Sequence, residues 1–335
     1  MPKRVAVLGG GGFIGGHLAK RLKSQGDWVR VVDLKFHSYF DINEICDEFL
    51  IGDLAYPAFA SEVLSGSFDE VYQLAADMGG AEYLFSGLND ANVISNSALI
   101  NIHVAKAAVK HGVKKLFFSS SACVYPEFNQ IDPLNPNCEE DSAYPAQPDS
   151  EYGWEKLFSE RVYLAFRKNY GLNIRIARFH NIFGPFGTWS GGKEKAPAAM
   201  LRKAIECEEG GEIEVWGDGS QTRSFLFIED CLFAIQALME ADFSDPINIG
   251  SENLISINSM AEIAVRISGK NIRIKNLRGK EFENKYGFPC PIGVMGRNSH
   301  NKLFEEKTGS KIQSDLESGL KETYHWIKSQ FEQTK

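Results

Sequence analysis

Apolar and polar residues follow one another along this chain in blocks that predict alternating strands and helices. Short apolar runs, rich in valine, isoleucine and leucine, recur through the first half, and segments of helical character separate them. Continuous apolar runs of this length are typical of strands that are buried on both faces of a parallel sheet. The runs that predict strands are 4–8, 28–32, 49–54, 71–76, 114–119 and 174–179. The pattern therefore predicts an α/β fold with a Rossmann-type, doubly wound parallel sheet.

The pattern changes in the second half of the chain, where glycine-rich and basic stretches interrupt shorter apolar runs. We expect 1–180 to form the Rossmann domain, with a later segment at about 220–250 returning to it. The remainder, 181–335, is expected to form mainly a smaller C-terminal lobe that binds substrate. Further expected elements are helices at 96–111 and within 312–330, a surface excursion at 126–148 and a loop-rich segment at 279–297.

Composition narrows the class of protein. The chain has 335 residues, 43% of them hydrophobic, which is ample for a core. A net charge of −8 argues against a nucleic-acid partner. No apolar run is long enough to span a membrane, and no signal peptide precedes the first strand, so we expect a soluble, cytoplasmic protein without a membrane partner. The six cysteines form no C-x-x-C pair, which suggests neither disulfides nor a metal site.

A glycine-rich turn follows the first predicted strand. Gly9, Gly12 and Gly15 come directly after 4–8 and lead into a helical segment. In a strand, turn and helix of this kind, the backbone can approach a pyrophosphate, and the helix N-terminus favours its negative charge. We therefore expect a dinucleotide site that includes Phe13 and Ile14.

An acid at the end of the second strand points to NAD as the dinucleotide. Asp33 stands at about the distance beyond the glycines where a carboxylate binds the adenosine ribose, and it would repel the 2′-phosphate of NADP. Asp53 could reach the adenine, with Leu54 beside it. Ala75 belongs to a run of small residues that lets the backbone come close to the cofactor.

The centre of the predicted chemistry is a serine near the end of strand 114–119 together with a Tyr-x-x-x-Lys pattern. Tyr152 and Lys156 are one helical turn apart and project from one helix face, so we expect the ammonium to lower the pKa of the phenol. With the hydroxyl of Ser121, they are suited to taking a proton from an alcohol while a hydride leaves for the cofactor.

The order of these features resembles the extended short-chain dehydrogenase/reductase family, which acts on nucleotide sugars. The resemblance covers nearly the whole chain and rests on the glycine turn, Asp33, Ser121, Tyr152, Lys156, Asn181 and Arg223. It implies that Ser121 and Tyr152 contact the C4 hydroxyl of the sugar, that Lys156 holds the nicotinamide ribose, and that NAD stays bound through a closed redox cycle. It also implies a homodimer.

Longer blocks, at 120–128, 178–189, 193–199, 216–219 and 296–299, are similar to the GDP-mannose 3,5-epimerase family. That resemblance implies a GDP-mannose or related GDP-sugar substrate, oxidation at C4, proton exchange at C5 or C3 or both, and re-reduction at C4. It also implies an acid and base pair on opposite faces of the sugar, with Cys123 as base and Lys195 as acid. Cys123 lies two residues past Ser121 and would point the same way on an extended strand end. Lys193 is a competitor of Lys195 that spacing alone does not exclude.

The remaining predicted contacts are with the nucleotide sugar. Guanidinium groups suit a diphosphate, so the arginines in the matched blocks are expected to anchor it. The full set of expected substrate-binding residues is Met78, Gly79, Gly80, Ser121, Cys123, Asn181, Lys195, Ala196, Arg223, Arg297 and Ser299.

Other functions remain open at this stage. A 4-epimerase would need only the tyrosine, and a 4-dehydrogenase would release the keto-sugar instead of reducing it again. A 4,6-dehydratase is disfavoured, because Ala122 and Cys123 stand where its acidic pair would follow the serine position. A non-catalytic dinucleotide sensor on this fold is disfavoured because both Tyr152 and Lys156 are present.

Overall fold

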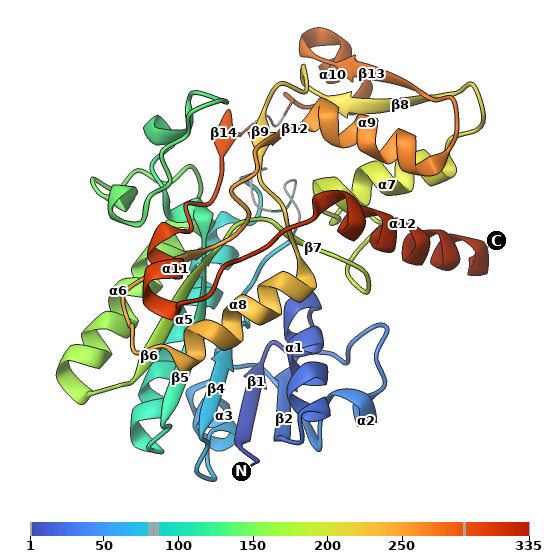
Figure 1. The fold of residues 1–335 in the computed structure, drawn as a ribbon. Helices are drawn as coiled ribbons and strands as arrows, with labels where there is room; N and C mark the ends of the chain where they lie inside the picture. Colours follow the sequence, from blue (N-terminus) through green and yellow to red (C-terminus); the bar gives the residue numbers. More distant parts are fainter. Residues whose placement is uncertain (1, 80–82, 84–86, 291–292, 335) are drawn as a thin grey trace.

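A seven-stranded parallel sheet organises the molecule (Figure 1). The computed structural model describes residues 2–79, 83, 87–290 and 293–334. The strands of the main sheet are β1 (Arg4–Leu8), β2 (Trp28–Asp33), β3 (Glu48–Ile51), β4 (Glu70–Gln73), β5 (Lys115–Ser121), β6 (Ile174–Phe179) and β11 (Ile247–Ile249). Their order across the sheet is β11, β6, β5, β4, β1, β2, β3, and every neighbouring pair is parallel. This confirms the predicted fold class.

Helices cover both faces of the sheet. One apolar cluster joins one face to α3 (Pro57–Val63), α5 (Asp90–Lys110) and α6 (Glu151–Tyr170). Another cluster joins the opposite face to α1 (Phe13–Ser24) and α8 (Ile228–Glu240). Chain order reverses between β1 and β4, and ligands of such sheets bind at this switch point, beyond the strand ends.

The second half of the chain adds a lobe above the carboxyl ends of the strands (Figure 1). Its core continues the cluster around α1 and α8, so the two parts share apolar contacts. The elements here are β7 (Ile182–Phe183), α7 (Ala196–Glu206), β8 (Glu212–Trp216), β9 (Thr222–Arg223), β10 (Leu226–Phe227), β12 (Ile255–Ser256), α9 (Ile257–Ser268), β13 (Arg273–Leu277), α10 (Gly279–Tyr286), β14 (Gly296–Arg297), α11 (Lys302–Thr308) and α12 (Leu316–Gln333). α8 and β11 pack on the main sheet, in the region expected to return to it. The domain boundary itself stays a prediction.

The expectation of a loop-rich segment at 279–297 is wrong for its first part. Residues Gly279–Tyr286 form α10. Phe282 is fully buried, and its ring and that of Tyr286 pack against Trp216. These contacts supply the burial that makes a short helix stable.

Short elements complete the chain. α2 (Ile42–Ile45) follows β2, a 3₁₀ turn at Ala122–Val124 follows β5, and the excursion contains 3₁₀ turns at Glu127–Gln130 and Glu140–Ala143. Among the described residues, no helix is both long and apolar enough to cross a bilayer.

Candidate active site

The glycine turn forms a tight cradle at the carboxyl end of β1. Gly9 has φ +88°, and a Cβ there would lie 2.7 Å from the backbone nitrogen of Ala75. A Cβ on Gly15 would lie 2.2 Å from the carbonyl oxygen of Gly9. Gly12 caps α1 without any side-chain hydrogen bond, and Phe13 and Ile14 begin the helix. The helix N-terminus is therefore left for an anion, and the cradle fits the pyrophosphate of NAD.

Asp33 holds the turn beside this cradle. Its carboxylate accepts hydrogen bonds from the backbone N–H groups of Gly11, at 2.9 Å, and Leu34, at 2.7 Å. Burial raises the pKa of Asp33, although these N–H groups oppose the rise. A half-buried carboxylate at this strand end fits the ribose hydroxyls of the cofactor. Asp53 and buried Leu54 lie just past the end of β3, two strands from β1 in the sheet. The carboxylate of Asp53 accepts a hydrogen bond from the N–H of Ala55 at 2.8 Å.

The end of β5 turns sharply, and this corrects the expected route to Cys123. Ser121 is the last residue of the strand, and its hydroxyl accepts a hydrogen bond from the N–H of Cys123 at 3.2 Å. Cys123 thus lies in a 3₁₀ turn and not on an extended strand. The turn still brings its side chain against Tyr152.

Helix α6, which carries Tyr152 and Lys156, approaches this turn very closely. Ser150 caps the helix by accepting from the N–H of Gly153 at 3.3 Å. A Cβ on Gly153 would lie 2.2 Å from the carbonyl oxygen of Cys123, so only glycine permits this approach. The close approach brings Tyr152 near Ser121, whose hydroxyl opposes the rise in the pKa of the phenol.

The expectation that Lys156 lowers the pKa of Tyr152 is wrong for this structure. Burial raises the pKa of Tyr152 well above its usual range, and the negative charge of Cys123 adds to the rise. The ammonium of Lys156 donates to the carbonyl oxygen of Ser119 at 3.0 Å and lies 5.6 Å from the ring centre of Tyr152. Burial also lowers the pKa of Lys156. Desolvation is therefore the largest cause of the pKa shift of both Tyr152 and Lys156.

Arg297 contacts the thiol of Cys123 directly. Its Nη1 donates to the sulfur at 3.2 Å, its Nη2 to Asp149 at 3.1 Å and its Nε to Gln130 at 2.5 Å. Burial would lower the pKa of Arg297, but Cys123 and Asp149 outweigh it and raise that pKa above its usual range. The guanidinium predicted to anchor a diphosphate thus lies beside the predicted base.

Arg223 is held next to Arg297 because β9 and β14 pair in parallel, with these two residues in register. Arg223 donates to the carbonyl oxygens of Thr222 and Val294, each at 2.8 Å. Burial, with Arg297 adding to it, lowers the pKa of Arg223 to about 10. Asn181 stands between β6 and β7 at φ +42° and donates to the carbonyl oxygen of Ser224 at 2.9 Å.

Lys195 and Lys193 lie in different surroundings. Water reaches the Lys195 side chain, yet protein atoms crowd its ammonium, and this desolvation lowers its pKa. Cys123 is the largest charge opposing that decrease. Lys193 instead places its ammonium 5.4 Å from the ring centre of Tyr83. The surroundings therefore associate Lys195, and not Lys193, with the thiol.

The other predicted substrate residues are more scattered. Met78 is exposed and Gly79 half-buried after β4, and Ala196 is the first residue of α7, directly after Lys195. Gly80 lies outside the described residues. Ser299 is completely buried, and its hydroxyl donates to Asn301 at 2.6 Å. No surface of Ser299 is accessible to a ligand in this structure.

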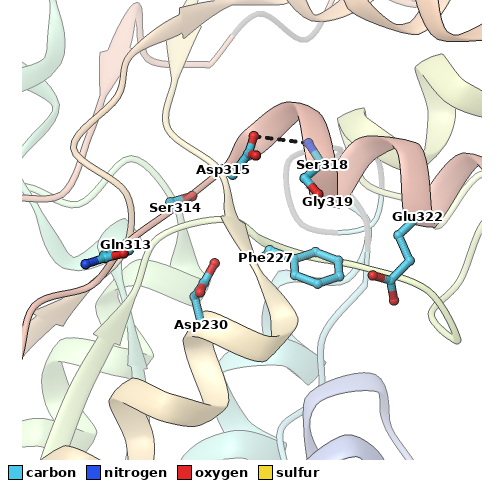
Figure 2. Close-up of a pocket in the computed structure, with 8 residues that line it drawn as sticks. All are labelled: Phe227, Asp230, Gln313, Ser314, Asp315, Ser318, Gly319 and Glu322. Carbon is cyan, nitrogen blue, oxygen red and sulfur yellow. Dashed lines mark hydrogen bonds between the residues drawn. The ribbon is translucent and has the colours of Figure 1, made fainter.

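Two cavities are lined by none of Ser121, Cys123 and Tyr152. One, of about 510 Å³, lies between the starts of α8 and α12 and contains none of the predicted site residues (Figure 2). Asp230, Asp315 and Glu322 line it and would repel a diphosphate, and burial, with help from Glu229, raises the pKa of Asp230 to about 6. A second, of about 280 Å³, borders Asp149 and the start of α6. We therefore place the candidate site at Ser121, Cys123 and Tyr152.

Sequence reasoning missed the residues that support these groups. Gln130 and Asp149 hold Arg297, and Glu155 lies fully buried beside Lys156. The only signal for Glu155 was its place within the Tyr-x-x-x-Lys block, and nothing in the sequence pattern marked the other two.

Comparison with known proteins identifies the family. Residues 5–250 match the model of the NAD dependent epimerase/dehydratase family, and the chain belongs to this family. The predicted family, enzyme class and NAD cofactor are thereby confirmed.

Within the family, the chain is similar to GDP-mannose 3,5-epimerase of Arabidopsis thaliana, with 42% identity over 99% of this chain and 84% of that protein. GDP-mannose 3,5-epimerase 1 of Oryza sativa subsp. japonica is likewise 42% identical, over 99% of this chain and 83% of its own. The predicted resemblance to this group is confirmed. The crystal structure of UDP-glucose 4-epimerase from Thermotoga maritima, with UDP-glucose, has the same fold, with a TM-score of 0.82, 24% identity and coverage of 98% and 99% of the two chains.

Proposed function

We propose that this enzyme acts on GDP-mannose, inverting C5, C3 or both. The observation that carries the proposal is the packing of the thiol of Cys123 against Tyr152, at the turn where Ser121 ends β5. Cys123 is also the first-named group that opposes the lowered pKa of Lys195. A 4-epimerase has no use for the thiol and this amine. The highly similar plant enzymes named for inversion at C3 and C5 also favour this reaction over the 4-epimerase and 4-dehydrogenase alternatives.

The reaction needs a ketone at C4, because a sugar C–H bond is acidic enough for a side chain only when it is α to a carbonyl. Bound NAD, held at the glycine turn and Asp33, would supply the hydride acceptor and donor that this transient ketone needs. Tyr152 takes the proton of the C4 hydroxyl, and Ser121 donates a hydrogen bond to the C4 oxygen. Lys156 lies 5.6 Å from the ring centre of Tyr152, and its proposed role is to hold the nicotinamide ribose.

Proton exchange is assigned to Cys123 and Lys195. Cys123 as thiolate removes the proton α to the carbonyl, and Lys195 returns one from the opposite face. Arg297 donates to the sulfur at 3.2 Å and places a positive charge beside the proposed base. The lowered pKa of Lys195 makes its ammonium a better proton donor near neutral pH. Arg223 and Asn181 remain the proposed contacts to the nucleotide sugar.

The test is incubation with GDP-mannose in deuterated water, with NAD supplied only in amounts equal to the enzyme. Deuterium at C3 or C5 of the recovered sugar, seen by NMR, is the expected result. An inverted C4 without label would indicate a 4-epimerase. A released keto-sugar, limited to one turnover, would indicate a 4-dehydrogenase.

We also propose a homodimer formed through α5 and α6, working in the cytoplasm. Leu99, Trp154 and Phe158 expose 43%, 41% and 48% of their surface on these two packed helices. An apolar helix face of this kind suits a second copy of the same face. All six cysteines are free, as in proteins of reducing compartments.

The dimer is tested by Phe158→Arg. It should convert the protein to a monomer in sedimentation, while Phe128→Arg, at an exposed residue of the excursion, leaves the mass unchanged. A wild-type protein that sediments as a monomer would exclude the dimer.

A further inference from the structure

Glu155 directly precedes Lys156 in α6 and is fully buried, and the proposed reaction assigns it no role. Glu155 has no exposed surface, yet it follows Trp154, which is exposed on the same helix. Asn101 donates to its Oε1 at 2.9 Å, and Ser159 donates to the same oxygen at 2.6 Å. Its other oxygen, Oε2, is buried and has no hydrogen-bond partner among the described residues. A buried carboxylate with a bare oxygen is costly and calls for a reason.

Glu155 is also the centre of a polar network that reaches the cofactor side of the sheet. Gln73, at the end of β4, donates to Asn101 at 3.0 Å and to the carbonyl oxygen of Ala75 at 2.9 Å. Tyr163 donates to the same oxygen of Asn101 at 3.1 Å. All members except Ala75 are buried. The network therefore fixes the carboxylate of α6 relative to α5 and the strand end beside the dinucleotide turn.

The charged groups around Lys156 leave Glu155 as its main compensation. Glu155 is the largest negative influence on Lys156, followed by Cys123 and Glu160. Glu160 is already paired with Arg178 at 2.8 Å. The groups that α5 and β4 contribute to the network, Asn101 and Gln73, are neutral. From β5, the backbone carbonyl oxygen of Ser119, also without a net charge, accepts from the ammonium of Lys156. The pKa of Tyr152 is raised most by burial. Among the charged groups, Cys123 raises it more than Glu155 does.

We propose that Glu155 is a positioning residue that acts as the buried counter-charge of Lys156 and so sets the pH range in which Tyr152 and Lys156 work. The inference rests on the proposed role of that pair. A negative charge at this place keeps the ammonium protonated and at the same time disfavours the phenolate. Both ionisations are thus moved to higher pH by one carboxylate.

The experiment compares Glu155→Gln with its parent, both in a Cys123→Ala background, where C4 oxidation is followed without the proton exchange that comes after it. The amide oxygen of glutamine can still accept from Asn101 and Ser159, so mainly the charge is lost. The pH profile of the rate of nicotinamide reduction by GDP-mannose should stay bell-shaped in Glu155→Gln. Both limbs of the profile should move to lower pH by about one unit. Tyr163→Phe, which removes a hydrogen bond of the same network without changing its charge, should leave both limbs in place.

A second readout does not depend on activity. Because burial lowers the pKa of Lys156, the folded protein gains stability as pH rises through that pKa. Without the charge of Glu155 this gain comes at lower pH, so the unfolding midpoint of the NAD-bound Glu155→Gln variant should rise relative to wild type between about pH 7 and pH 10. A difference in unfolding midpoint between the two proteins that stays the same at every pH would indicate a merely structural role for Glu155.

The outcomes separate the two proposals. If the limbs of the pH profile do not shift, and the difference in unfolding midpoint is the same at every pH, the proposed role of Glu155 is wrong and the proposed reaction is unaffected. Full activity of Tyr152→Phe would overturn the reaction itself. If Glu155→Gln does not fold, Glu155→Ala in the same background, which also removes the charge, should move both limbs in the same direction, and an unchanged profile there would also overturn the inference.

Discussion

The cofactor side and the reaction side of this molecule are built in different ways. The cofactor cradle uses backbone groups from one short stretch, Gly9 to Asp33, and its shape depends on the absence of side chains. The reaction side gathers polar side chains from distant segments: the turn after β5, the excursion with Asp149 just after it, α6, Lys195 just before α7, and the paired strands β9 and β14.

This difference determines how each side fails. A backbone cradle tolerates changes nearby and fails only when a side chain fills it. A cluster of buried charges fails when any member is lost, because each one offsets the desolvation of the others. Changes at Cys123 and Lys195 should therefore affect turnover with little effect on NAD binding, and changes at the cradle should do the reverse.

The largest expected effect is that of Cys123→Ala. Loss of the proposed base should lower the rate of deuterium incorporation from solvent by about 10³-fold. NAD affinity, measured by calorimetry, should stay within about twofold, because the thiol belongs to the reaction side only. Incorporation at the wild-type rate would mean that another group is the base.

Lys195→Met should rank second, with incorporation lowered by about 10²-fold at the carbon where this lysine returns the proton. Lys193→Met is the matched control, since its ammonium lies over Tyr83 and away from the thiol. NMR of the product separates the two carbons. Equal losses in both variants would mean that the basic loop acts as a whole and that no single lysine is the acid.

Gly9→Ala tests the cradle. A residue with a side chain at φ +88° is strained, and its Cβ would meet the backbone of Ala75 at 2.7 Å, so NAD affinity should fall by about tenfold or more. Gly26→Ala carries similar strain, at φ +92°, with no atom within 4 Å of the new Cβ, and it should bind NAD normally. Weakened binding in both would point to general destabilisation.

The same contrast explains what could be predicted from the sequence. Strands β1, β2, β4, β5 and β6 follow the predicted runs closely because continuous apolar runs must be buried. The dinucleotide turn was predictable because its function is carried by residues close together in sequence. Asp33 was found in the same way.

The reaction side was predictable only in part. Local spacing predicts roles for Ser121, Tyr152 and Lys156, and these roles stay predictions, whereas the raised pKa of Tyr152 has no local signal, since it depends on burial by other segments. The 3₁₀ turn at Cys123 and the contact from Arg297, 174 residues away, have no local signal. α10 was missed because its apolar face becomes visible only with Trp216 beside it.

The smallest expected effect is that of Asp33→Asn, which tests whether a carboxylate that shapes the turn also binds the ribose. An amide oxygen can still accept from the Leu34 N–H, but the amide nitrogen cannot accept from Gly11, so NAD affinity should fall by only about threefold. The pH dependence is the sharper test. Burial raises the pKa of Asp33, so wild-type affinity should begin to weaken, as pH falls, at a higher pH than the usual carboxyl value of about 4 implies. The asparagine variant should lack this dependence, and calorimetry that gives the same pH profile for both proteins would leave Asp33 a purely structural role.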